Sequence, residues 1–247
     1  MIAESLEAAY PKAGNVSPLV SRGFTYADLL IEAWRLKKVC ETGLPLGLSL
    51  YTFLRSQRVT ALSGFAILAT PLFKCLHLGL HMGECGRIAV ERSTPLDAYW
   101  YLMGLKESGM THLKRVYAKN FPDVNDPQKA LEKGWNLAYV LKMSKDTLSY
   151  EILHGYPLSR MGAEYLLENG MERIPELQGL ILSKALDDLV ARKHGYEVAI
   201  RLTEMARANV HEFYIKALGL NPGTTADIIG VAILMALSEK LKEGELK

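Results

Sequence analysis

The sequence has 247 residues, of which 49% are hydrophobic and 23% are charged, and its formal net charge is +2. This composition excludes disorder as the main state, and the near balance of charge gives no electrostatic footprint for nucleic acid. The first seven residues carry acids where a secretory signal carries bases, and the longest strongly apolar run, 59–73, is too short to span a bilayer. We therefore expect a cytoplasmic protein that binds neither nucleic acid nor a membrane.

Apolar residues recur at helical spacing nearly throughout, and no long stretch alternates with the period of two that is typical of strands. Residues 27–39 predict an early helix. Residues 96–105 predict another, with Pro95 at its first position and Ser93 or Thr94 as its N-cap. Asp97 then falls in the first turn, where the helix dipole favours a carboxylate.

Two segments, 59–73 and 224–241, are apolar on all sides, which is typical of helices that are buried on most sides. The longest helical pattern runs over 181–217 and is broken once, at residues 194–195. No internal repeat or change of composition divides the chain. We therefore predict an all-α fold, with residues 1–247 forming a single large helical domain around two buried apolar helices.

The first polar cluster is residues 10–18, YPKAGNVSP. Its two prolines and its glycine fix an irregular turn. From such a turn Lys12, Asn15 and Ser17 can face one ligand, and Lys12 would supply positive charge to a phosphate. The alternative is a loop that ends a helix and carries a solvated lysine.

The second cluster is residues 185–195, ALDDLVARKHG. Asp188 and Arg192 are four residues apart and share one helix face, so an ordinary ion pair explains them. A functional interpretation is that the two acids, Asp187 and Asp188, bind Mg²⁺. Arg192 and Lys193 would then bind the oxygens of a triphosphate.

The third cluster is residues 219–227, GLNPGTTAD, which precede the apolar helix. Thr224 and Thr225 open this helix, whose free backbone N–H groups attract phosphate. Asp227 follows within the first two turns, beside strongly apolar residues. Helix capping or a favourable contact with the helix dipole explains Asp227 about as well as a functional role.

Together, the segments PKAGNVSP, LDDLVARKHG and NPGTTADI resemble the triphosphoribosyl-dephospho-CoA synthase family, and most of all its archaeal branch. Their order and approximate spacing agree over nearly the whole chain, and NPGTTAD is the most specific piece. The resemblance implies an all-helical transferase whose substrates are ATP and 3′-dephospho-CoA. In the reaction of that family, the 2′-hydroxyl of the acceptor ribose attacks C1′ of the ATP ribose and adenine leaves.

The resemblance also implies the site. Mg²⁺ would shield the triphosphate, and a carboxylate would assist the attack of the hydroxyl. The catalytic residues would be Asp188 and Asp227, and the metal ligands would be Asp187, Asp188 and Asp227. The nucleotide- and phosphate-binding residues would be Lys12, Asn15, Arg192, Lys193, Asn221, Thr224 and Thr225. A homodimer is kept as a candidate assembly.

The sequence departs from the family pattern in several places, and one of them replaces two asparagines. Where archaeal relatives usually have Asn-Thr-Asn-Leu-Gly ahead of a buried helix, this sequence has Thr60-Ala61-Leu62-Ser63-Gly64. An apolar side chain cannot restore the hydrogen bonds of a lost amide. Two other interpretations therefore stay open: another ribosyl transfer in an archaeal cofactor pathway, and a nucleotide-binding family member with altered or lost catalysis.

Overall fold

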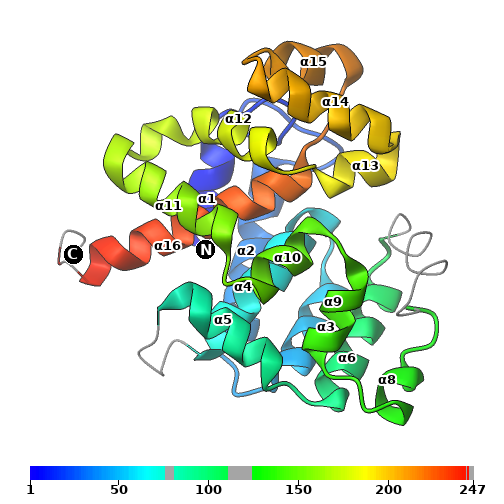
Figure 1. The fold of residues 1–247 in the computed structure, drawn as a ribbon. Coiled ribbons are helices and arrows are strands. Elements are labelled where there is room, and N and C mark those ends of the chain that lie inside the picture. Colours follow the sequence, from blue (N-terminus) through cyan, green and yellow to red (C-terminus); the bar gives the residue numbers. More distant parts are fainter. Residues whose placement is uncertain (76–80, 111–123, 243, 245–247) are drawn as a thin grey trace. The chain divides into compact units, whose positions relative to one another are not determined.

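The computed structural model describes residues 1–75, 81–110, 124–242 and 244. These residues form 15 α-helices and two short 3₁₀ turns, with no β-strand among them (Figure 1). The predicted all-α fold is confirmed. Within the same residues, no helix combines the length and the apolar character that crossing a bilayer requires.

The chain divides into two compact units. Unit 1 consists of Met1–Ala33 and Pro157–Lys247, and unit 2 consists of Trp34–Tyr156. Helix α2 (Tyr26–Cys40) begins in unit 1 and ends in unit 2, and it confirms the helix predicted over 27–39. The single domain over residues 1–247 stays a prediction.

Unit 1 is built around its last helix. Its other helices are α1 (Ile2–Ala9), α11 (Pro157–Asn169), α12 (Ile174–Lys184), α13 (Asp188–His194), α14 (Tyr196–Arg207), α15 (His211–Leu218) and the 3₁₀ turn η3 (Met171–Arg173). Helix α16 (Gly223–Lys242) is the core helix, and α1, α11, α12 and α13 pack against it. A Cβ atom at Gly162 of α11 would lie 2.9 Å from the Cβ of Ala232, so the glycine permits this close approach.

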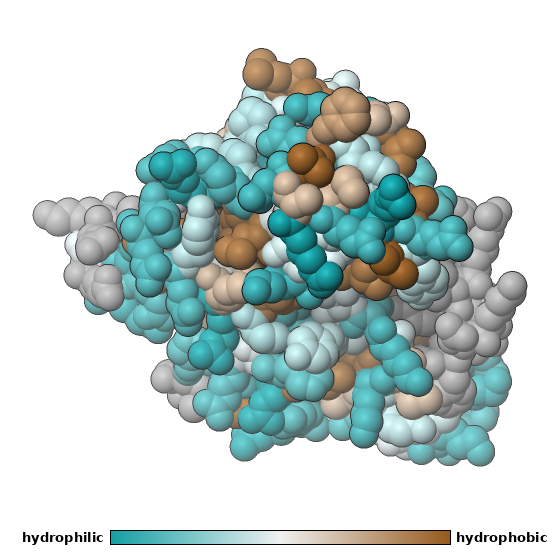
Figure 2. Space-filling model, turned by 45° about the horizontal axis from the view of Figure 1, so that its top comes forward, coloured by the Kyte–Doolittle hydropathy of each residue, from teal (hydrophilic) through white to brown (hydrophobic). Residues whose placement is uncertain are grey.

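A second apolar cluster joins α12 to the three helices that follow it. It is made by Leu182, Val190, Ala191, Ala199, Leu202, Ala206, Ile215 and Leu220. On the outside, α14 and α15 expose large apolar side chains, among them Tyr196 and Phe213. Brown atoms gather at the top of the space-filling view, where these helices lie (Figure 2).

Unit 2 is built around α4 (Ser63–Cys75), which follows the 3₁₀ turn η1 (Thr60–Leu62). Its other helices are α3 (Leu46–Ser56), α5 (Met82–Glu91), α6 (Pro95–Glu107), α8 (Gln128–Glu132), α9 (Leu137–Ser144) and α10 (Thr147–Leu153). Six residues of α4 between Phe65 and Leu72 are buried apolar side chains. The two predicted apolar helices are therefore confirmed, and each unit contains one of them.

Helix α6 begins as the sequence predicts. Thr94 is its N-cap and Pro95 its first residue, and Thr94 and Asp97 form a reciprocal capping box. Asp97 Oδ1 also accepts a hydrogen bond of 2.8 Å from the N–H of Gly47. A Cβ atom at Gly47 would lie 2.1 Å from the carbonyl oxygen of Asp97, so this close approach of α3 to α6 requires a glycine.

The helical pattern over 181–217 is broken more often than predicted. The predicted break at Gly195 is present, and this glycine has φ +99°. A further break precedes α13 because Asp187 bonds the N–H of Val190 and so caps a new helix. Another follows α14, where Asn209 adopts the left-handed conformation with φ +56°. A short polar side chain can stabilise either arrangement locally, and apolar periodicity does not reveal this.

Candidate active site

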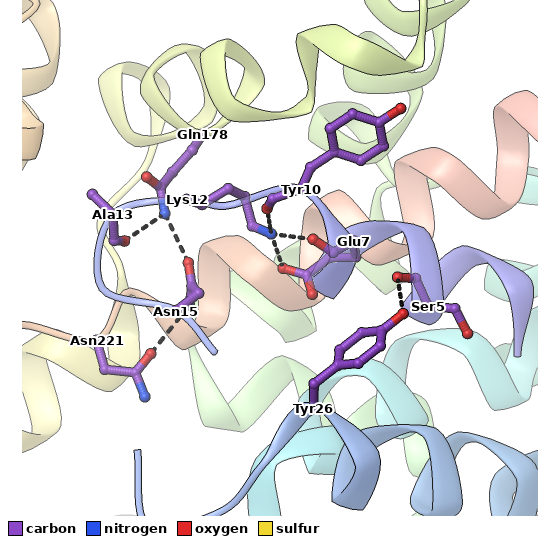
Figure 3. Close-up of polar contacts among 9 residues, drawn as sticks. All are labelled: Ser5, Glu7, Tyr10, Lys12, Ala13, Asn15, Tyr26, Gln178 and Asn221. Carbon is purple, nitrogen blue, oxygen red and sulfur yellow. Dashed lines mark hydrogen bonds and ion pairs between the residues drawn. The ribbon is translucent and has the colours of Figure 1, made fainter. Parts of the chain in front are cut away.

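The predicted phosphate ligand Lys12 lies in the loop after α1, where its side chain is fully buried. Its ammonium nitrogen lies 2.8 Å from Glu7 Oε1 and donates to the carbonyl oxygens of Glu7 and Tyr10 (Figure 3). An ammonium group has three N–H donors, and all three have partners here. Lys12 is therefore not a solvated lysine, and a phosphate would have to compete with Glu7 for it.

Three side-chain amides join segments that are far apart in the sequence. Gln178 Nε2 on α12 donates to Asn15 Oδ1 over 2.8 Å and to the carbonyl oxygen of Ala13 over 3.0 Å (Figure 3). Asn15 Nδ2 in turn donates to Asn221 Oδ1 over 3.1 Å. The structure thus brings the predicted residues Asn15 and Asn221 together, and Gln178 completes the chain of amides.

Two further features fix the first loop against the segment before α16. Gly14 has φ +79°, and a Cβ atom there would lie 2.4 Å from the carbonyl oxygen of Leu220. Only a glycine fits that conformation and that space without strain. Further along the loop, Arg22 Nη1 donates to the carbonyl oxygen of Gly219 over 3.2 Å.

The second and third sequence clusters meet where α13 and α16 begin. Asp187 Oδ2 accepts hydrogen bonds from the backbone N–H of Thr225 over 2.8 Å and from its hydroxyl over 2.9 Å. Thr224 Oγ1 accepts one from the N–H of Leu189 over 3.1 Å. The N–H of Gly223 bonds the carbonyl oxygen of Asn221. These contacts tie the two helix starts together, so the N–H groups of Gly223 and Thr225 are not free for a phosphate.

Asp187 is a buried carboxylate that has no free oxygen. Oδ1 accepts from the N–H of Val190 over 3.0 Å, Oδ2 is bonded to Thr225, and the residue is 1% exposed. Burial raises the pKa of Asp187 to about 6, although the hydrogen bonds from Thr225 and Val190 oppose the rise. The nearby charge of Asp188 adds to it. Asp187 therefore acts as the N-cap of α13 and as its link to α16.

Three acidic residues, Glu4, Glu7 and Asp227, lie on the two helices α1 and α16, which pack together. Burial raises the pKa of Glu4 well above its usual range. The charges of Glu7 and Asp227 raise this pKa further, and Lys12 opposes them. Asp227 itself is half-buried on the second turn of α16. It is therefore placed beside a group that is protonated more readily than an ordinary carboxylate.

The cations of the second cluster lie in the last turn of α13. Arg192 is half-buried, and its Nε is a buried donor without a hydrogen-bond partner in the described part of the chain. Partial burial lowers the pKa of Lys193, and the charges of Arg192 and Arg22 lower it further. No ion pair of Arg192 or Lys193 is found among the described residues, and the functional role of Asp188 stays a prediction.

The comparisons with known proteins agree on one family. The model of the ATP:dephospho-CoA triphosphoribosyl transferase family matches residues 2–245. The chain belongs to this family. A solved protein from Archaeoglobus fulgidus, assigned provisionally as a triphosphoribosyl-dephospho-CoA synthase, is 26% identical to it with a TM-score of 0.69, over 86% of this chain and 98% of that one. No curated protein matches the sequence.

Membership confirms the predicted enzyme class and reaction. The chain is a transferase of the triphosphoribosyl group from ATP to dephospho-CoA. The two alternatives, another ribosyl transfer and a catalytically altered nucleotide-binding protein, are not favoured. The archaeal origin, the cytoplasmic location and the homodimer stay predictions of the sequence.

The stretch in which this family member lacks asparagines lies in unit 2, at the start of α4. Leu62 is buried there with 1% exposure. Ser63 Oγ donates to Gln57 Oε1 over 2.8 Å and also bonds the carbonyl oxygen of Thr60 over 2.9 Å. The segment is therefore a packed helix start in which the polar side chain of Ser63 is satisfied.

The predicted metal ligands do not form a ready-made cage. Within the described residues, no group of three Asp, Glu, His or Cys side chains is arranged to hold a metal ion. Of the predicted ligands Asp187, Asp188 and Asp227, the first has both oxygens bonded to the chain. Three carboxylates holding a resident Mg²⁺ do not fit this arrangement.

Sequence reasoning missed three residues of this region. Glu4 and Glu7 served only as evidence against a secretory signal, although their spacing of three places them on one face of α1, just before the loop. Gln178 is a lone amide in an otherwise apolar helical pattern, and it is 1% exposed. A buried amide needs hydrogen-bond partners, and a lone Gln in an apolar helical pattern could therefore have indicated a long-range polar contact.

Proposed function

We propose that the transfer uses the polar residues that unit 1 gathers around the first loop, the start of α13 and the start of α16. One observation supports this most strongly: the three sequence clusters that carry the family resemblance are bonded to one another, through Asn15–Asn221 and Asp187–Thr225. Bonds of this kind hold the side chains between them in a fixed geometry, which catalysis requires.

In this proposal the triphosphate of ATP binds at Arg192 and Lys193. Both cations lack an ion-pair partner in the described residues, and guanidinium groups suit phosphate oxygens because they bind them in pairs. Mg²⁺ arrives as the counter-ion of the triphosphate, as part of the substrate. Lys12, Thr224 and Thr225 act mainly by holding the loops. The Lys12 ammonium and the Thr225 hydroxyl already donate to the chain, and the Thr224 hydroxyl oxygen accepts from the N–H of Leu189.

Asp227 is the proposed general base. It takes the proton of the 2′-hydroxyl of dephospho-CoA while that oxygen bonds to C1′ of the ATP ribose. The bond from C1′ to adenine breaks, its electron pair leaves with adenine, and one proton returns to the leaving base. Asp188, half-buried in the first turn of α13, is the second candidate for the same role.

The reaction itself is tested by incubating the purified protein with ATP, Mg²⁺ and dephospho-CoA. Mass spectrometry follows adenine and the triphosphoribosyl adduct, which should appear in equal amounts. ATP with dephospho-CoA omitted is the control for simple hydrolysis. A well-folded protein that releases no adenine with this acceptor would contradict the proposal.

A further inference from the structure

A third cation, Arg22, acts electrostatically on Lys193 as Arg192 does, and no sequence motif pointed to it. Arg22 belongs to the loop between α1 and α2 and is half-buried. Its guanidinium group donates one hydrogen bond, to the carbonyl oxygen of Gly219, which directly precedes the segment carrying Asn221. Since a guanidinium group has five N–H donors, most of its donors remain for another ligand.

We call Arg22, Arg192 and Lys193 the cation cluster. In the described part of the chain, none of them pairs with a carboxylate. Lys12, from the same loop as Arg22, shows the contrast because it is buried and paired with Glu7. Cations that crowd together without an acid repel one another, and this arrangement becomes favourable when an anion joins them.

Two observations support a place for an anion beside these cations. Arg192 Nε is buried and has no hydrogen-bond partner in the described residues, which is costly for a charged group. Partial burial lowers the pKa of Lys193, and the charges of Arg192 and Arg22 lower it further. Asp187 is the opposing charge, and its carboxylate is already bonded to Thr225 and Val190.

We propose that Arg22 is a phosphate-binding residue that acts together with Arg192 and Lys193 on a polyphosphate group. The inference rests on the proposed function, and it names the residue from the first loop that contacts the substrate. The hydrogen bond to Gly219 holds the guanidinium group beside the segment that carries Asn221, so one side chain would bind phosphate and also join the first loop to that segment. Two substrates carry such a group: ATP has a triphosphate and dephospho-CoA has a diphosphate.

The direct test measures the binding of inorganic tripolyphosphate by calorimetry. Arg22→Gln keeps a donor for Gly219 and removes the charge, and we expect about 10- to 100-fold weaker binding. Arg22→Lys keeps the charge without the paired donors, and its affinity for tripolyphosphate should lie between those of Arg22→Gln and the wild type. Arg207→Gln is the matched control, because Arg207 Nε also donates to a helix-end carbonyl, that of Ser183, over 3.0 Å. Its affinity should stay within about 2-fold of the wild type.

Kinetics then distinguish the two sources of phosphate. A rise in KM for ATP with an unchanged KM for dephospho-CoA assigns Arg22 to the triphosphate, and the reverse assigns it to the diphosphate. Equal affinity of Arg22→Gln and the wild type for tripolyphosphate and both substrates would overturn the inference while the reaction stands. Wild-type protein that binds neither tripolyphosphate nor ATP would overturn the inference and the proposed function together.

Discussion

The two units satisfy their buried polar groups in different ways. In unit 2, the buried carboxylate of Asp97 is enclosed by the N–H and hydroxyl of Thr94 and by the N–H of Gly47, in a helix cap. In unit 1, the buried amides of Asn15 and Gln178 bond each other across distant segments of the chain. Asp97 completes a helix start and also joins α6 to α3, whereas the amides of Asn15 and Gln178 join the first loop to α12.

The difference extends to charge. In unit 1 the charges of Arg22 and Arg192 both act on Lys193, and in the described residues no carboxylate forms an ion pair with these three cations. A folded chain tolerates such a cluster when a ligand supplies the missing charge. This contrast underlies the proposal that the substrate phosphates bind in unit 1.

Asp227→Asn should abolish most of the turnover. Loss of a general base lowers kcat by about 10²- to 10⁴-fold, while substrate binding and thermal unfolding should change little. Adenine release measures the effect. Glu197→Gln, at an exposed acid of α14, is the matched control and should keep full activity. Full activity of Asp227→Asn would show that Asp227 is not the general base.

Lys12→Met should destabilise unit 1, because it leaves the buried carboxylate of Glu7 without its cation. Breaking a buried pair in this way costs about 3–5 kcal/mol, which corresponds to a fall of about 10 °C in Tm. The control is Lys216→Met, which removes an exposed pair with Glu212 and should cost under about 1 kcal/mol. Equal stability of the two variants would show that the ion pair of Lys12 with Glu7 does not stabilise the fold.

The stability of the protein should depend on pH through Asp187. Its pKa is about 6 in the folded state against an ordinary value of 3.8. Since the folded state holds the proton more tightly, this group lowers the free energy of unfolding by about 3 kcal/mol as pH rises from about 4 to about 7. Asp187→Asn lacks this titration. Urea unfolding should therefore show the free energy of the wild type falling relative to the variant by that amount, and a difference that is constant with pH would contradict the assignment.

Thr94→Ala tests the helix cap of unit 2, which we assign to stability alone. It removes the capping hydroxyl of α6 in unit 2 and should lower the free energy of unfolding by about 1 kcal/mol. The turnover of the folded variant should equal that of the wild type. A large loss of kcat at saturating substrates would show that this cap takes part in the reaction.

Local sequence patterns predicted the features that depend on neighbouring residues. Composition alone was enough to predict the apolar helices α4 and α16. The order Ser-Thr-Pro-Leu-Asp of residues 93–97 was enough to predict the start of α6. The grouping of Asn15 with Asn221 came from a resemblance across the whole chain. No local pattern pairs two residues so far apart.

The remaining features depend on long-range contacts. Lys12 has the same local sequence whether it faces solvent or Glu7, and only the packing of α1 decides between them. The N–H of Thr225 is free in an isolated helix, and here Asp187 occupies it. Arg22 lies in an unremarkable Ser-Arg-Gly segment until the fold places it near Lys193. Burial and pairing of polar groups follow from tertiary structure, and periodicity does not report them.

The most direct test of the account is hydrogen exchange of the protein with and without ATP and Mg²⁺. We predict slower exchange of backbone amides in residues 12–24, 187–195 and 219–227 of unit 1 when the nucleotide binds, with little change across 94–107 of unit 2. Protection confined to unit 2, with none in these three segments, would contradict the assignment of the phosphate-binding site to unit 1.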